Sequence, residues 1–267
     1  SDQEEGTPTL TMSGLTTNGT QGQTINEDSE HTLAITSAAL NQNAGVCGAV
    51  TVERRDQYGN VVNTGVSATL TAASTSGGTH GFYSDSGCLT PLGSSQFTIG
   101  AGNGDVTIYY SDQEEGTPTL TMSGLTTNGT QGQTINEAAE HTLAITSAAL
   151  NQTAGACGAV TVERRDQYGN VVNTGVSATL TAASTSGGTH GFYSDSGCLT
   201  PLGSSQFTIG AGNGDVTIYY SDQEEGTPTL TMSGLTTNGT QGQTINEDSE
   251  HTLAITSVSY THLTLPT

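Results

Sequence analysis

Four cysteines are the residues of this chain best suited to covalent chemistry. They form two pairs with the same spacing, Cys47 with Cys88 and Cys157 with Cys198. No Cys-x-x-Cys motif occurs and the histidines are scattered along the sequence, which disfavours zinc binding. One even pair in each half predicts one disulfide per half, with two free buried thiols as the alternative. Closing a loop of roughly 40 residues would contribute about 4 kcal/mol on the chain-entropy account of disulfide stability.

Carboxylates are the second group of residues that could do chemistry, and they gather in residues 27–30 and 112–115. Ca²⁺ takes roughly six to eight hard oxygen ligands, and these stretches would lie where successive domains meet. The second half of the chain, however, has Ala138 and Ala139 where the first half has Asp28 and Ser29. We therefore expect solvated acidic loops and no cofactor, with Ca²⁺ at the domain junctions as the alternative. The candidate ligands are Glu27, Glu30, Asp112, Glu114 and Glu115.

The sequence Asp-Gln-Tyr-Gly-Asn occurs twice, and its composition is typical of a tight turn. Its Asp and Asn could hold a cation. More often such side chains form hydrogen bonds with the backbone of their own turn, while the glycine supplies a positive φ. A structural turn is therefore the prediction for Asp56, Gly59 and Asn60, and for Asp166, Gly169 and Asn170.

No arrangement of catalytic residues stands out. A Ser or Cys nucleophile needs a neighbouring base that a third group orients, and His31 and His80 stand in no such context. Spacing alone leaves a carboxylate pair for glycoside hydrolysis open. A Lys–Asn isopeptide bond is excluded because the chain has no lysine. We predict that the protein is not an enzyme.

Four asparagines match the acceptor pattern for N-glycosylation, Asn-x-Ser/Thr. The pattern is short and frequent in a chain rich in threonine, so it marks candidate sites only. They are Asn18, Asn128, Asn151 and Asn238.

The elements that must position these residues repeat along the chain. Residues 1–110 and 111–220 are identical except at four positions, and a third copy matches from Ser221 through Ser257. The differences are Asp28/Ala138, Ser29/Ala139, Asn43/Thr153 and Val46/Ala156. Repetition of this kind indicates an array of one structural unit, and each unit has the length of one small domain. Because Ser1 opens within a repeat, we interpret the chain as a fragment of a longer protein.

Within one repeat, apolar and polar residues alternate in short runs separated by turn residues, which predicts strands. The third run should place Val66, Ala68, Leu70 and Ala72 on one face. No sustained helical periodicity occurs, and Ala38–Ala44 is the one candidate for a helical turn. The seven predicted strands are 31–37, 48–54, 65–73, a piece around Phe82, 96–100, 105–110 and 117–123.

Seven short antiparallel strands in this length predict an all-β fold of tandem immunoglobulin-like β-sandwich domains. The first domain should span 30–127 and the second 140–237, with linkers at 128–139 and from 238 onward. Residues 1–29 should hold the last strand of a truncated preceding repeat plus a linker. Residues 238–267 should hold a linker and the first strand of a truncated next repeat, at 250–257. The final segment, 258–267, departs abruptly from the repeat, and we interpret it as an artefact or as a divergent terminal repeat.

The charge balance argues against two classes of partner. The formal net charge is −21, and the only basic residues besides histidine are four arginines. An acidic surface repels nucleic acid and anionic membranes. No stretch approaches the roughly 20 apolar residues of a membrane span, so we expect no membrane insertion of this segment.

Three motifs give the chain a family resemblance. They are the Asp56–Asn60 turn after CGAVTVERR, the run FYSDSGC at 82–88, and the closing segment FTIGAGNGDVTIYYSDQEEGTPTLTMSG at 97–124. Together they resemble the bacterial immunoglobulin-like repeats of the invasin/intimin type, which occur in large secreted and cell-surface proteins. The resemblance implies a rod of sandwich domains outside the cell, serving as a stalk or an adhesin. Its partners would be the neighbouring repeats of the same chain.

Three functions follow as hypotheses. The first is a structural spacer that holds a distal module away from the cell. The second is an adhesin whose repeated faces bind a glycan or a protein by avidity, with Tyr58, Tyr83 and Tyr109 as candidate anchors. The third is an extracellular filament built by strand exchange between chains.

Overall fold

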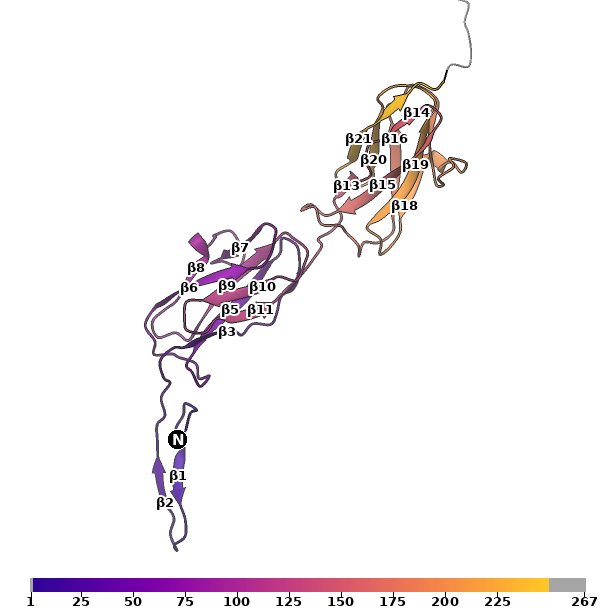
Figure 1. The fold of residues 1–267 in the computed structure, drawn as a ribbon. Helices are drawn as coiled ribbons and strands as arrows, with labels where there is room; N and C mark the ends of the chain where they lie inside the picture. Colours follow the sequence, from indigo (N-terminus) through magenta and orange to yellow (C-terminus); the bar gives the residue numbers. More distant parts are fainter. Residues whose placement is uncertain (1, 250–267) are drawn as a thin grey trace, which may run out of the picture. The chain divides into compact units, whose positions relative to one another are not determined.

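The computed structural model describes residues 2–249, which form two compact units (Figure 1). The first unit contains residues up to Glu140 together with Arg165–Val172, and the second contains His141–Arg164 and the residues from Asn173 onward. The strand predicted at 250–257 and the segment 258–267 lie outside the described residues.

The first unit contains a β-sandwich of two four-stranded sheets in which neighbouring strands are antiparallel, which confirms the predicted fold class. One sheet has the order β3-β5-β9-β7 and the other β11-β10-β6-β8. In the first sheet the bounds are β3 Thr32–Ile35, β5 Cys47–Arg55, β9 Asp105–Asp112 and β7 His80–Tyr83. In the second they are β11 Gly129–Gly132, β10 Thr119–Ser123, β6 Ala68–Ser74 and β8 Gln96–Ile99, with a 3-10 turn, η1, at Gly93–Ser95.

The core lies between the two sheets and follows the predicted period of two. Alternate residues of each strand point inward, so Val50 and Val52 from β5 face Leu70 from β6 and Met122 from β10. All four are at most 1% exposed. Each fully buried apolar side chain of this size contributes roughly 1.5–3 kcal/mol, so the sandwich is held mainly by these layers.

The segment Ala38–Ala44 is not a helical turn, so that prediction was wrong. It contains β4, Asn41–Asn43, which pairs in parallel with β12, Thr134–Asn136. Ala44 is buried, and Gly45 follows it with a φ of 79°. The chain therefore forms a short pair of edge strands here, which the sequence 38–44 did not reveal because it lacks apolar alternation.

The predicted linker 128–139 is also wrong, because most of it belongs to the sandwich. β11 pairs with β10 along its whole length, and Ile135 of β12 is only 1% exposed. A Cβ at Gly129 would lie 2.8 Å from the carbonyl oxygen of Leu33, so only glycine fits this close approach of two strands. The segment from 238 onward likewise contains β21, Gly239–Gly242, and β22, Thr244–Asn246, rather than beginning as a linker.

Val66 departs from the predicted strand pattern and is 74% exposed. Strand β6 begins only at Ala68, because the carbonyl oxygen of Val66 turns away to accept a hydrogen bond from the Arg54 guanidinium. A polar contact with the backbone thus overrides the apolar alternation at this position.

The second unit contains a sandwich built in the same way. Its sheets have the orders β13-β15-β19-β17 and β18-β16-β20-β21, and β14 pairs in parallel with β22. The bounds are β13 Thr142–Ile145, β14 Asn151–Thr153, β15 Cys157–Arg165, β16 Ala178–Ser184, β17 His190–Tyr193, η2 Gly203–Ser205, β18 Gln206–Ile209, β19 Asp215–Asp222 and β20 Thr229–Ser233.

The N-terminal segment forms a two-stranded hairpin, β1 (Thr9–Met12) with β2 (Gly19–Gly22), rather than the single strand plus linker that we predicted. Its sequence matches β10 and β11. Leu10 and Met12 are 56% and 79% exposed, whereas Leu120 and Met122 are fully buried. The same apolar residues are exposed here because the described residues offer this hairpin no second sheet.

The polypeptide enters and leaves each sandwich at opposite ends. In the first unit it enters beside the end of β5, where Thr32 pairs with Arg55. It leaves after Asn136, which lies opposite Asn43 and therefore near the start of β5 at Cys47. The nine residues of β5 span about 26 Å, so one repeat carries the chain across at least that distance.

Candidate functional site

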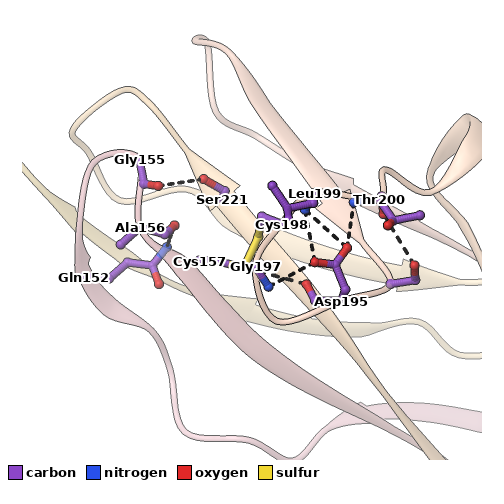
Figure 2. Close-up of a disulfide and its surroundings, with 11 residues drawn as sticks. Gln152, Gly155, Ala156, Cys157, Asp195, Gly197, Cys198, Leu199, Thr200 and Ser221 are labelled. Carbon is purple, nitrogen blue, oxygen red and sulfur yellow. Dashed lines mark hydrogen bonds between the residues drawn. A yellow bond between two sulfur atoms is a disulfide. The ribbon is translucent and has the colours of Figure 1, made fainter.

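Both predicted disulfides are present, and the described residues include no free cysteine. Cys47 at the start of β5 is joined to Cys88, and Cys157 at the start of β15 is joined to Cys198. Each bond closes a loop over a sequence separation of 41 residues. The bond ties the loop that follows β7 or β17 to the start of β5 or β15 in the same sheet, as Figure 2 shows for the second unit.

A carboxylate organises the cysteine loop. In Figure 2, Asp195 accepts hydrogen bonds from the backbone N–H groups of Gly197, Leu199 and Thr200. These hydrogen bonds, above all that from Leu199, hold the pKa of Asp195 below its ordinary value. Cys198 has a φ of 52°, a conformation that non-glycine residues adopt rarely, and the closed loop maintains it.

The Asp56–Asn60 segment forms a self-contained turn. The Asp56 carboxylate accepts hydrogen bonds from the N–H groups of Tyr58 and Asn60, both at 2.9 Å, and Gly59 has a φ of 95°. Burial of the carboxylate raises its pKa, but the hydrogen bonds from Asn60, Asp28 and Tyr58 outweigh this effect and lower the pKa to about 2. Asp166 makes the matching hydrogen bonds with Tyr168 and Asn170.

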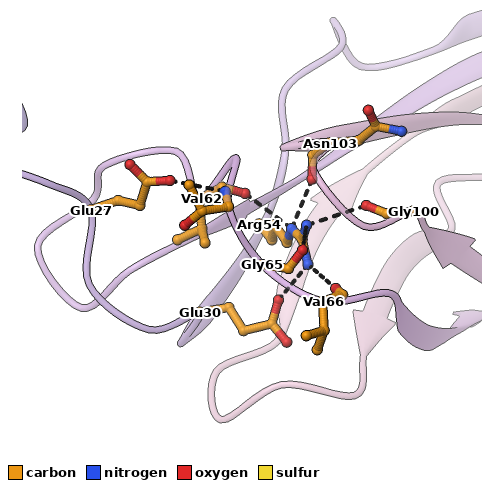
Figure 3. A network of polar contacts seen from close by, with 9 residues as sticks. Glu27, Glu30, Arg54, Val62, Gly65, Val66, Gly100 and Asn103 are labelled. Atoms are coloured by element: carbon orange, nitrogen blue, oxygen red, sulfur yellow. Dashed lines mark hydrogen bonds and ion pairs between the residues drawn. The ribbon is translucent and has the colours of Figure 1, made fainter.

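Arg54 is a buried polar centre that we did not single out from the sequence. Its guanidinium is fully buried and donates to Glu30 at 2.7 Å (Figure 3). The same group donates to five backbone carbonyls, those of Val62, Gly65, Val66, Gly100 and Asn103. The sequence did contain a signal: Arg54 continues the inward-facing positions of Val50 and Val52 along β5. Arg164 donates to the matching carbonyls of Asn213, Val176, Gly175 and Gly210.

Asp112, one of the five candidate Ca²⁺ ligands, is a core residue. It is fully buried and accepts hydrogen bonds from the hydroxyls of Tyr110, at 2.6 Å, and Ser76, at 3.0 Å. Burial and the Asp112 carboxylate raise the pKa of Tyr110 well above its ordinary range. The Tyr110 hydroxyl and the Asp112 carboxylate therefore bind each other within β9, and Ser76 joins them to the loop after β6.

The other candidate ligands also have separate local roles. Glu30 is paired with Arg54, and Glu27 accepts the backbone N–H of Thr64 at 2.9 Å. Glu114 lies over Gly78, while burial, Glu137 and Asp166 raise the pKa of Glu115. Within residues 2–249, no group of three or more His, Cys, Asp or Glu side chains is placed to hold a metal ion. The structure therefore does not bring the five carboxylates into one coordination site.

The candidate binding residues differ in exposure. Tyr58 is 50% exposed, whereas Tyr83 and Tyr109 are partly buried and lie opposite each other on β7 and β9. The four candidate glycosylation sites, Asn18, Asn128, Asn151 and Asn238, are all exposed. In the described part of the chain, no helix is long and apolar enough to cross a membrane.

Comparison with known proteins gives likeness at the level of structure only. No protein-family model and no curated protein sequence matches the chain. The chain is similar to bacterial immunoglobulin-like domains. It matches the D0-D1 domain of intimin at 13% identity and a TM-score of 0.27, over 80% of this chain and 96% of that one.

Two further solved structures illustrate the range. The Escherichia coli adhesin FdeC matches at 14% identity and a TM-score of 0.35, over 85% of this chain and 68% of that one. Domains 5-6 of the surface-layer protein SbsC match at 16% identity and a TM-score of 0.30, over 83% and 99%. A β-glycosidase is also among the matches. The fold assignment here rests on the sheets and their register.

Proposed function

We propose that this chain is a non-catalytic extracellular spacer made of repeated, disulfide-closed sandwich domains. The observation that carries the proposal is that the polypeptide enters each sandwich at one end and leaves it at the other. In an array of such units, each added repeat extends the chain by about the length of β5. The two disulfides favour an oxidising compartment, which means the cell surface or the medium.

The positions at which the copies differ support a structural role. Asn43/Thr153 lies on the exposed edge strand β4 or β14, and Val46 is 48% exposed. Asp28 and Ala138 both donate their backbone N–H groups to the Asp56 or Asp166 carboxylate, at 3.1 and 2.9 Å, and the Asp28 carboxylate also accepts a hydrogen bond from Gln57 at 3.0 Å. The buried core and the cysteine loop are therefore kept, while the changes fall at exposed positions or preserve the backbone hydrogen bond to the turn.

An adhesin-type role is the second candidate, and the Tyr83–Tyr109 pair favours it. Two neighbouring tyrosines on one sheet face offer the amphipathic rings that binding surfaces use. A glycan or protein ligand at this face would bind weakly per repeat and gain by avidity. Substituting both tyrosines by serine should abolish binding to any such ligand and leave a spacer's dimensions unchanged.

Small-angle X-ray scattering of the full chain, first with Ca²⁺ and then with EDTA, tests the spacer. We expect an extended profile that chelation does not change. An extended profile that becomes flexible in EDTA would overturn the expectation of solvated acidic loops and make the junction carboxylates Ca²⁺ ligands. A compact or freely flexible profile under both conditions would contradict the spacer.

A further inference from the structure

The first unit includes the second copy of the Asp-Gln-Tyr-Gly-Asn turn, and this turn contacts the first sandwich. Tyr168, which belongs to this unit, is partly buried and packs against the hydrophobic core of the first sandwich. A Cβ added to Gly45 would overlap the hydroxyl and ring of Tyr168. The glycine therefore leaves the space that the tyrosine ring fills.

Asn170 fixes the same turn to backbone groups. Its Nδ2 donates to the carbonyl oxygen of Gln113 at 2.8 Å, and its Oδ1 accepts the N–H of Glu115 at 3.0 Å. The amide side chain thus pairs with the loop after β9 as a neighbouring strand would. Each bond uses a backbone group that would otherwise be left to solvent.

The same pair of asparagine hydrogen bonds occurs a second time. Asn60 donates to the carbonyl oxygen of Gln3 at 2.8 Å and accepts the N–H of Glu5 at 3.1 Å. Gln3 and Glu5 are the residues of the preceding copy that match Gln113 and Glu115. Two independent occurrences with the same partners indicate a built contact rather than a chance one.

The tyrosine differs between the two copies in an informative way. Tyr58 is 50% exposed, and the described residues before it include none that matches Gly45. The turn sequences around Tyr58 and Tyr168 are identical, and within the described residues the partner surface at Gly45 covers Tyr168 and not Tyr58. Tyr58 is therefore a natural control for Tyr168.

We propose that the Asp-Gln-Tyr-Gly-Asn turn is a docking element that binds the end of the preceding repeat. The tyrosine sits against the glycine that follows β4, and the asparagine clamps the loop that follows β9. The partner that this surface fits is another copy of the same repeat. The proposal rests on the array of the proposed function, although an array can remain extended without this particular contact.

Nitration of tyrosines by tetranitromethane in the full chain tests this docking. Cleavage after Arg55 and Arg165 places Tyr58 and Tyr168 in different fragments. Tandem mass spectrometry of each fragment then separates nitration at Tyr58 or Tyr168 from nitration at the other tyrosines. We expect Tyr58 to be nitrated several-fold faster than Tyr168. Gly45→Ala should raise the rate at Tyr168 to that of Tyr58.

Gly155→Ala is the matched control. Gly45 and Gly155 have φ values of 79° and 80°, so alanine strains both backbones equally, but an added Cβ at Gly155 meets no described atom within 4 Å. It should leave Tyr168 protected. If Gly45→Ala does not fold, Asn170→Ala with Asn60→Ala as its control gives the same comparison.

Equal nitration of Tyr58 and Tyr168 in the unaltered chain would overturn the docking proposal. So would a Tyr168 that stays protected in both folded Gly45→Ala and Asn170→Ala variants. Scattering separates this failure from that of the proposed function. An extended chain with an unprotected Tyr168 would retain the spacer and remove the docking turn.

Discussion

At the scale of single residues, buried polar side chains hold the loops in place by hydrogen bonds. Arg54 satisfies five carbonyls and Glu30 from one buried guanidinium, a geometry that the planar fork of arginine allows and a lysine ammonium does not. Asp56 and Asp112 do the same with carboxylates. The turn motif predicted the role of Asp56, whereas Arg54 was not singled out and Asp112 was a candidate Ca²⁺ ligand. A linear pattern does not reveal which groups converge on a buried side chain.

Arg54→Met should therefore destabilise the first domain by about 3 kcal/mol or more, because it leaves buried carbonyls and Glu30 without their donor. Urea unfolding followed by circular dichroism measures the loss, with the second domain as an internal reference. Arg55→Met is the control: Arg55 is 38% exposed beside Glu53, so its loss should be about 1 kcal/mol or less. Equal losses in the two variants would contradict the role given to the buried guanidinium.

The Asp56 turn should make stability depend on pH at the acid end. The pKa of Asp56 is lowered from 3.8 to about 2 in the fold, so the unfolded chain binds this proton first as the pH falls. The stabilisation is present above about pH 4 and is lost as the pH falls towards 2. Urea midpoints of the unaltered chain and Asp56→Asn should therefore converge over that interval. A difference between the two that stays constant from pH 7 to pH 2 would refute the assignment.

At the scale of strands, the sequence predicts the strands in which apolar and polar residues alternate. It misses the strands that lack this alternation and are held by backbone and polar hydrogen bonds. The strands that hold Val50, Leu70 and Met122 were expected because every second residue is apolar. The stretch 129–136 reads as Gly, Thr and Gln, yet it forms two strands. There Gln133, 2% exposed, accepts the backbone N–H of Leu40 and so replaces an apolar contact. The disulfides were predictable because pairing of cysteines needs only an even count per repeat.

Ile135 tests the corrected domain boundary. It is 1% exposed, so Ile135→Ala should destabilise the first domain by about 3 kcal/mol, as expected for a large-to-small change in a core. The matched control is Ile25→Ala, since Ile25 has the same local sequence but is only partly buried beside Gly6. Its loss should stay below about 1 kcal/mol. A tolerated Ile135→Ala would return residues 128–139 to the status of a linker.

At the scale of the whole chain, the sandwiches repeat, and the polypeptide enters and leaves each one at opposite ends. A force that pulls on the two ends of the chain would therefore pass through one sandwich after the other. Each unit is closed by its own disulfide, and the loop inside that bond cannot extend when the ends are pulled. The chain should therefore unfold as two elements that release equal lengths of polypeptide. The near-identical sequences of the two copies predict that the two lengths are equal. The sheet topology predicts that the force acts from one end of each sandwich to the other.

Single-molecule stretching of the full chain tests this account most directly. We predict two unfolding steps of equal length, each of which lengthens by about 14 nm when a reductant opens the disulfide and releases the 41-residue loop. A single step, or steps whose length the reductant does not change, would contradict a spacer of two disulfide-closed domains in series.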